Sequence, residues 1–149
     1  MILLDSCAVL EILWGGAEAR ELSEYLDAEE LQGVEIVFLN LALLESCSAV
    51  AIRHKERQGP RSGAFEADLA TVAGFQTQPI ADDLTPEIIM EAARIKLHHA
   101  ASMVDCYLIA NALHRKAAII SSDSEVLEYN AQRATVRRIT SRFSSIHWR

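Results

Sequence analysis

The chain has 149 residues, half of them hydrophobic, and its 14 Lys and Arg against 21 Asp and Glu give a net charge of −7. This length and hydrophobic fraction predict a single domain over residues 1–149 and exclude a disordered chain. The negative charge argues against a protein that holds nucleic acid through phosphate contacts alone.

The first half of the chain predicts, in order, a strand at Ile2–Leu4, helices at Ser6–Leu13 and Ala17–Leu31, a strand at Val34–Leu39 and a helix from Asn40 to about Arg57. Gly15 and Gly16 end the first helix, and Asn40 can cap the long one. On that long helix an apolar stripe faces the core and includes one acid; its members are Leu41, Leu44, Glu45, Ser48, Ala49 and Ile52.

The second half predicts a loop at Gln58–Gly63, a helix from Phe65 to Gly74, a weak strand at Thr77–Ala81, helices from Pro86 to His98 and Ser102 to Lys116, a strand at Ala117–Ile120, a short helix at Ser124–Asn130 and a strand near Thr135–Ile139. Strands that alternate with helices form right-handed βαβ units. We therefore expect an α/β fold with a short parallel sheet of about four or five strands, flanked by helices on both faces.

Four acids are predicted to meet at one edge of this sheet. Asp5 and Asp123 follow strand ends, Glu45 lies early in the helix after a strand, and Asp105 lies in the first turn of a helix that precedes one. Ligands of such folds bind beyond the carboxyl ends of the strands.

Each aspartate also has a structural explanation when it is taken singly. Asp5 can cap the helix after it, Asp105 fits the S-x-x-D capping box, and Asp123 can cap a helix whose dipole favours Glu125. Glu45 has no comparable explanation, because the rest of its predicted stripe is apolar or small. The joint placement of the four favours a shared site.

Neighbouring carboxylates repel each other, and a hard divalent cation with oxygen preference, Mg²⁺ or Mn²⁺, relieves that repulsion. Such a cation lowers the pKa of a bound water and neutralises charge on a phosphodiester. The pattern therefore predicts a metal-dependent phosphodiesterase whose nucleophile is water.

The segments that contain these acids, Ile2–Ser6, Leu44-Glu45, Val104–Ala112 and Ser121–Asp123, resemble the four acidic motifs of PIN domains, and most closely those of VapC-type toxins from toxin–antitoxin pairs. The resemblance implies a Mg²⁺- or Mn²⁺-dependent endoribonuclease that acts on RNA, forms a homodimer and is inhibited by a small antitoxin. It also implies metal-binding and catalytic roles that fall on Asp5, Glu45, Asp105 and Asp123, with supporting hydroxyls from Ser121 and Ser6.

Two other functions fit parts of the sequence. A phospho-acceptor domain also has an acid after its first strand, but Asp5-Ser6-Cys7 lacks a second Asp, and Asp82 and Asp83 only follow the predicted third strand. A PIN-like scaffold that binds RNA or a partner without cutting is the second alternative.

Location and surface charge complete the sequence-based expectations. No apolar run approaches the roughly 20 residues that cross a bilayer, and the N-terminus does not resemble a signal peptide. Three cysteines without an export signal suggest free thiols in a reducing cytoplasm. Basic residues form two clusters, which are solvated surface or phosphate contacts beside an acidic centre: Arg53, His54, Lys55, Arg57 and Arg61, then Arg133, Arg137, Arg138, Arg142 and Arg149.

Overall fold

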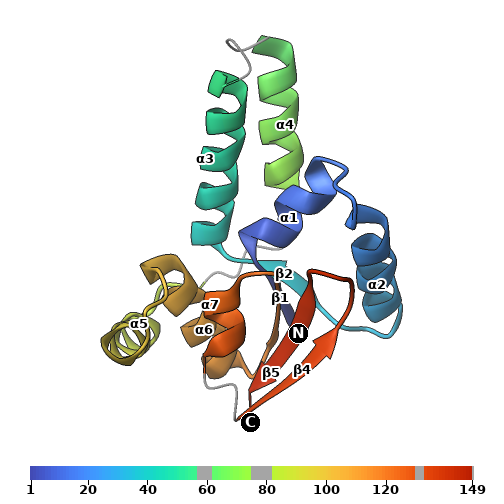
Figure 1. Cartoon of the computed structure of the whole chain (residues 1–149). Coiled ribbons are helices and arrows are strands. Elements are labelled where there is room, and N and C mark those ends of the chain that lie inside the picture. The colour runs from blue at the N-terminus through green and yellow to red at the C-terminus, as the bar shows by residue number, and fades with distance from the viewer. Residues whose placement is uncertain (57–61, 75–81, 130–132, 149) are drawn as a thin grey trace.

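The computed structural model describes residues 1–56, 62–74, 82–129 and 133–148 (Figure 1). Within them the elements are β1 (Ile2–Leu4), α1 (Ser6–Leu13), α2 (Ala19–Leu31), β2 (Ile36–Phe38), α3 (Asn40–Glu56), α4 (Ser62–Gly74), α5 (Pro86–His98), α6 (Met103–Arg115), β3 (Ala118–Ser121), α7 (Ser124–Glu128), β4 (Ala134–Arg138) and β5 (Ser144–Trp148). None of the helices in these residues could span a membrane.

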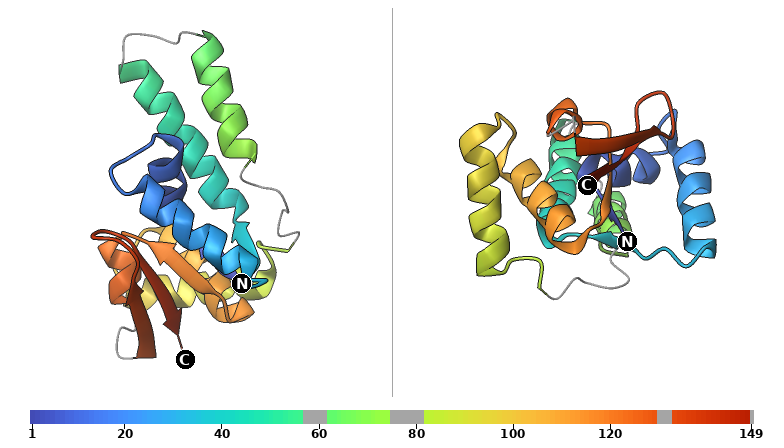
Figure 2. Two further views of the ribbon diagram at one scale, coloured as in Figure 1. Left: turned by 90° about the vertical axis from the view of Figure 1, so that its right-hand side faces the viewer. Right: turned by 90° about the horizontal axis from the view of Figure 1, so that it is seen from below.

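The five strands form one sheet in the order β2-β1-β3-β5-β4. Strands β2, β1 and β3 are parallel, whereas β5 runs antiparallel to both β3 and β4. Helices α1 and α2 lie on one side of the sheet, and α6 lies on the other side with α5 packed against it (Figure 2). The predicted α/β class, with helices on both faces, is therefore confirmed.

The sheet departs from the prediction at its β4 edge. Strand β5 was not predicted, and it makes the sheet mixed rather than wholly parallel. Residues 139–143 connect β4 to β5, and so short a connection allows only an antiparallel hairpin, because parallel strands need a longer crossover. The predicted strand Thr77–Ala81 and most of the predicted loop lie outside the described residues; Ser62 and Gly63 belong to α4.

The strand register brings three strand ends to the same level. Leu4 pairs with Phe38 of β2 and with Ile120 of β3. Asp5 therefore leaves the sheet beside Ser121 and beside the start of α3. Helix α6 precedes β3 and runs antiparallel to it, so its first turn reaches the same edge.

Helix α3 extends beyond this edge together with α4 (Figure 1). The predicted core-facing stripe on α3 is wrong: Leu44 is 65% and Ile52 56% exposed, and the buried residues are Ala42, Ser46 and Val50. Among the described residues, α3 packs mainly against α4 and α1. The face that meets those two helices is buried, although it is the less apolar one.

Asp83 fixes the start of α3. Its carboxylate is 4% exposed and accepts hydrogen bonds from the backbone N–H of Asn40 at 2.8 Å and from the Asn40 amide at 3.1 Å. The backbone carbonyl of Asp83 in turn accepts from the Asn111 amide on α6 at 3.1 Å. A carboxylate remote in the sequence thus caps the first backbone N–H of α3, at the helix start where the sequence predicted Asn40 as a cap.

We predict that Asp83→Ala lowers the free energy of unfolding by about 1–3 kcal/mol, because it removes a helix cap and the hydrogen bonds that Asn40 makes to a buried carboxylate. Chemical denaturation measures this loss. The matched control is Asp82→Ala, an exposed neighbour whose substitution should change stability by less than about 0.5 kcal/mol. Equal losses in the two variants would contradict the capping role.

Candidate metal centre

A pocket of about 450 Å³ lies where the parallel strands end. The four acids predicted from the sequence all line it, together with a fifth acid and several hydroxyl and thiol groups: Asp5, Ser6, Cys7, Glu45, Ser102, Asp105, Asp123, Ser124 and Glu125. The structure therefore brings together side chains that are up to 120 positions apart between Asp5 and Glu125. Asp83 is not among them, since its carboxylate is held at α3.

Asp5 occupies the N-cap position of α1, but its side chain makes no capping hydrogen bond. It is 5% exposed, and its Oδ2 instead accepts from the Ser121 hydroxyl at 2.5 Å and from the Cys7 thiol at 3.4 Å. The purely structural explanation of Asp5 as a helix cap therefore fails, and its carboxylate is directed to the strand end of β3.

Asp105 and Asp123 do hold helix ends, each through one oxygen. Asp105 Oδ2 accepts from the backbone N–H of Ser102 at 3.1 Å, which completes a capping box at the start of α6. Asp123 Oδ1 accepts from the N–H of Glu125 at 2.7 Å at the start of α7. Because a carboxylate has two oxygens, these caps leave a second oxygen of each group for a ligand in the pocket.

Two serine hydroxyls connect these acids to one another. Ser6 donates to Glu45 Oε2 at 2.6 Å and lies 3.4 Å from Asp5 Oδ1. Ser121 donates to Asp5 and accepts from the backbone N–H of Asp123 at 2.9 Å. Neutral hydroxyls therefore connect the carboxylates of Asp5 and Glu45 to each other and Asp5 to the backbone of Asp123.

Burial and neighbouring charge both act on the acids of the pocket. Burial, with the charges of Asp105 and Glu45, raises the pKa of Asp5 from 3.8 to about 6, although hydrogen bonds from Ser121 and Cys7 oppose the shift. Burial also raises the pKa of Asp105, and the charges of Asp123 and Glu45 add to that effect. Both burial and mutual repulsion therefore disfavour the charged forms.

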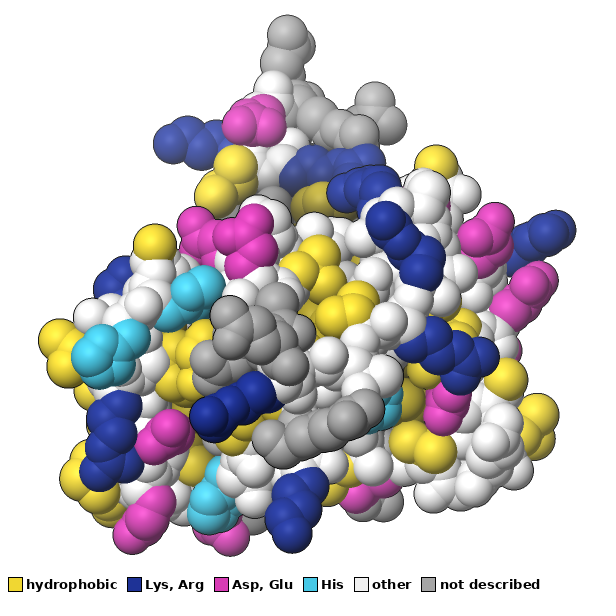
Figure 3. Space-filling model, turned by 60° about the horizontal axis from the view of Figure 1, so that its bottom comes forward, with side chains coloured by type: hydrophobic (Ala, Val, Ile, Leu, Met, Phe, Trp, Pro, Cys, Tyr) yellow, Lys and Arg dark blue, Asp and Glu magenta, His cyan; other side chains and the backbone are white. Residues whose placement is uncertain are grey.

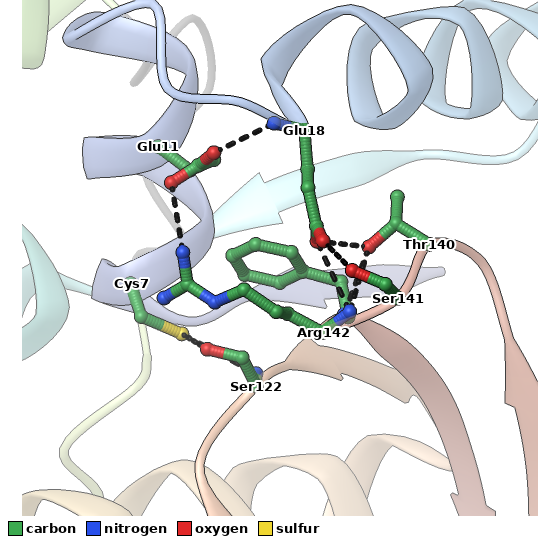
Figure 4. Close-up of polar contacts among 8 residues, drawn as sticks. Cys7, Glu11, Glu18, Ser122, Thr140, Ser141 and Arg142 are labelled. Atoms are coloured by element: carbon green, nitrogen blue, oxygen red, sulfur yellow. Dashed lines mark hydrogen bonds and ion pairs between the residues drawn. The ribbon is translucent and has the colours of Figure 1, made fainter.

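Cys7 contributes a neutral thiol to the pocket rim. Burial, with the charge of Asp5, raises its pKa to about 12. The hydroxyl of Ser122 donates to the Cys7 sulfur at 3.4 Å (Figure 4). A protonated thiol is a poor ligand and a poor nucleophile, so the chemistry of the pocket rests on its oxygen atoms.

The sequence left open whether Glu125 joins the site, because the dipole of a short helix also explains this acid. Its Oε2 accepts from the Ser102 N–H at 3.1 Å, and Asp105 accepts from the same N–H. The available signal was the spacing Asp123-Ser124-Glu125, which puts two acids in one helical turn at the predicted edge.

The set of donors fits a hard divalent cation. All five acids offer carboxylate oxygens, the ligands that Mg²⁺ and Mn²⁺ prefer, and a cation would offset both the burial of Asp5 and the repulsion around it. As the side chains of the described residues stand, no three His, Cys, Asp or Glu groups lie close enough together to hold an ion. The hydrogen bonds from Ser6 and Ser121 instead satisfy Glu45 and Asp5.

The family model described as the PIN domain matches residues 2–131. A search of curated proteins finds no match. The matched segment includes all five acids of the pocket and ends before β4, so the β4–β5 hairpin lies outside it.

We predict that Asp5→Asn raises the melting temperature of the metal-free protein at pH 7, because the substitution removes a buried charge. A pKa raised from 3.8 to about 6 corresponds to a penalty of about 3 kcal/mol. Between these two pH values the folded chain binds the extra proton, so the stability of the wild type should fall as pH rises from about 4 to 6.

Thermal melts in EDTA across this pH range measure the effect. Asp27→Asn, an exposed acid on α2, is the control and should keep the wild-type slope. If Asp5→Asn leaves the pH dependence of the melting temperature unchanged, another group causes that dependence.

Proposed function

The chain belongs to the PIN domain family, and from that premise we propose that it is a Mg²⁺- or Mn²⁺-dependent endoribonuclease, the toxin of a VapC-type toxin–antitoxin pair. The family is one of metal-dependent nucleases and implies RNA binding. The observation that supports the catalytic proposal most directly is the meeting of Asp5, Glu45, Asp105 and Asp123 in one pocket.

In this proposal the four acids hold the metal, and Glu125 is placed to join them. A bound cation would supply positive charge against the phosphodiester and would lower the pKa of a water molecule. Ser121 orients the carboxylate of Asp5, and Ser6 orients that of Glu45. The acids thus keep defined positions around the pocket that would receive the substrate.

Water is the proposed nucleophile because the pocket offers no activated side chain. The Cys7 thiol stays protonated, and the Ser6 and Ser121 hydroxyls donate their protons to carboxylates without a neighbouring histidine. The phospho-acceptor alternative is disfavoured, because Asp83 caps α3 instead of joining Asp5. A non-catalytic scaffold remains the second candidate, and cleavage assays separate it from the nuclease.

The partners in this proposal are a second copy of the chain and a small antitoxin that covers the acidic pocket, and the site of action is the cytoplasm. Apolar side chains on the surface of α3 and α5 support protein contacts: Leu44 and Ile52 on α3, and Ile89, Met90 and Leu97 on α5 are 47–76% exposed. Isolated exposed side chains are ordinary, but several on two helices provide surface for such partners.

We predict that the purified chain cleaves structured RNA with added Mg²⁺ or Mn²⁺ and that EDTA abolishes the cleavage. Asp5→Asn and Asp105→Asn should each lower the rate about a hundredfold or more, or roughly 3 kcal/mol in the barrier. Asp27→Asn is the control and should cleave as the wild type does. RNA binding without any cleavage would support the scaffold, and cleavage that survives both site substitutions would defeat the assigned roles.

We also predict that the isolated chain is a homodimer. Light scattering during size-exclusion chromatography measures the mass directly, at protein concentrations from low to high micromolar. A mass of one chain throughout this range would contradict the dimer and leave the nuclease proposal untouched.

A further inference from the structure

One face of α1 leads away from the acidic pocket. Cys7, Glu11 and Trp14 are spaced i, i+4 and i+7, so they lie in a row along the helix and its C-cap. Cys7 lines the pocket, and the row continues from it to the far end of α1. Two arginines from other elements lie on this row.

Arg142 comes from the β4–β5 turn and lies over Glu11. Its Nη1 is 3.5 Å from Glu11 Oε2, and its side chain is 60% exposed. Figure 4 shows the guanidinium between Glu11 and the Cys7–Ser122 pair. A guanidinium has five N–H donors, and a single ion pair engages only part of this set. Arg142 therefore presents donors to solvent about one helical turn from the pocket.

Arg53 comes from α3 and lies over the last position of the row. Its Cζ is 4.2 Å from the centroid of the Trp14 ring, a cation–π arrangement that holds the guanidinium against the ring. Lys and Arg side chains gather in a row on the face seen in Figure 3, descending from the end of the molecule where α3 and α4 project. Beside the acidic pocket, the two arginines thus give this face of α1 positive charge.

The turn that supplies Arg142 is firmly attached to the body of the protein. Glu18, 8% exposed, accepts hydrogen bonds from the hydroxyls of Thr140 and Ser141 and from the Arg142 N–H at 3.1 Å (Figure 4). The backbone N–H of Glu18 donates to Glu11 Oε1 at 2.9 Å. One network of carboxylates therefore fixes both the backbone and the side chain of Arg142.

Gly16 makes room for this network. A Cβ atom at this position would lie 2.1 Å from Glu11 Oε1, so a side chain there would displace the carboxylate that holds Arg142. Burial alone would raise the pKa of Glu18, but hydrogen bonds from Ser141, Thr140 and Arg142 keep it below its usual value. Glu18 therefore stays charged and keeps its acceptors available to the turn.

We propose that an RNA strand reaches the acidic pocket along the Cys7–Glu11–Trp14 face of α1, with its backbone phosphates bound by Arg142 and Arg53. This rests on the proposed function. A chain with a net charge of −7 and five acids at its pocket repels a polyanion, so local positive charge is needed where the strand enters. Guanidinium groups match phosphate in charge and geometry. Arg142 lies outside the segment that the family model matches.

The test is the affinity of the full chain for a short, fluorescently labelled single-stranded RNA of mixed sequence, measured by anisotropy in EDTA so that metal-dependent cleavage is absent. Arg142→Gln and Arg53→Gln should each weaken binding roughly three- to tenfold and reduce the salt dependence of log Kd by about 0.7 per lost phosphate contact. Arg20→Gln changes the net charge equally on α2, where Arg20 pairs with Glu24, and should bind as the wild type does.

Glu18 tests whether the placement of Arg142 matters as well as its charge. Glu18→Gln makes the chain more positive, so general attraction predicts tighter RNA binding, whereas a loosened turn predicts weaker binding. We expect weaker binding, and we expect Glu21→Gln, an exposed acid on α2, to bind as tightly as the wild type or slightly more so. Tighter binding by Glu18→Gln would show that the turn does not position Arg142.

The proposed RNA path is contradicted if Arg142→Gln and Arg20→Gln bind the RNA with the same affinity while both variants melt at the wild-type temperature. That outcome is distinct from failure of the nuclease proposal, which would appear as wild-type chain that binds the RNA through Arg142 but never cleaves it with Mg²⁺ or Mn²⁺. Where cleavage occurs, Arg142→Gln should raise KM and leave kcat close to the wild-type value.

Discussion

The candidate site is arranged around one buried carboxylate, that of Asp5. Asp5 follows β1, which lies between β2 and β3 in the sheet, has almost no contact with solvent and faces other acids across the pocket. An ionised carboxylate in this position is unfavourable without a positive partner, and the raised pKa of Asp5 expresses that conflict. Proteins retain such local conflicts mainly where function requires them. The burial of Asp5 therefore indicates a functional role, and the surrounding elements hold this carboxylate in its position.

Different elements of the fold position Asp5 and its neighbours. The register of β1, β2 and β3 brings Asp5, α3 and the β3–α7 loop to one level. Asp83 fixes the start of the helix that carries Glu45, and Ser121 joins Asp5 to the backbone of Asp123. Outside the pocket, Glu18 ties the β4–β5 turn to the start of α2. Hydrogen bonds and helix caps thus hold the acids in place around the pocket, and Asp105 and Asp123 each keep a second oxygen for a ligand.

The sequence predicted the parts that follow from local pattern. Strand β1, helix α1 and the capped helix α6 have the expected bounds or nearly so, and the four acids lie at the predicted edge, because βαβ topology alone determines which ends of the strands meet. The predictions that were wrong or incomplete concern features that depend on tertiary packing. Leu44 and Ile52 looked like core residues, but α3 extends past the sheet and buries its smaller side chains instead. Strand β5 and the capping role of Asp83 depend on partners far away in the chain, and local periodicity contains no information about them.

The central claim is that the acids around Asp5 form a binding site for a divalent cation. Calorimetric titration of the wild-type chain with Mn²⁺ near pH 6, in buffers of different ionisation enthalpy, tests it most directly. The account predicts saturable binding with release of protons, since Asp5 is partly protonated at this pH and must lose its proton to become a ligand. It also predicts that Asp5→Asn weakens this binding and removes most of the proton release. Mn²⁺ binding with the same affinity and proton count in both proteins would contradict it.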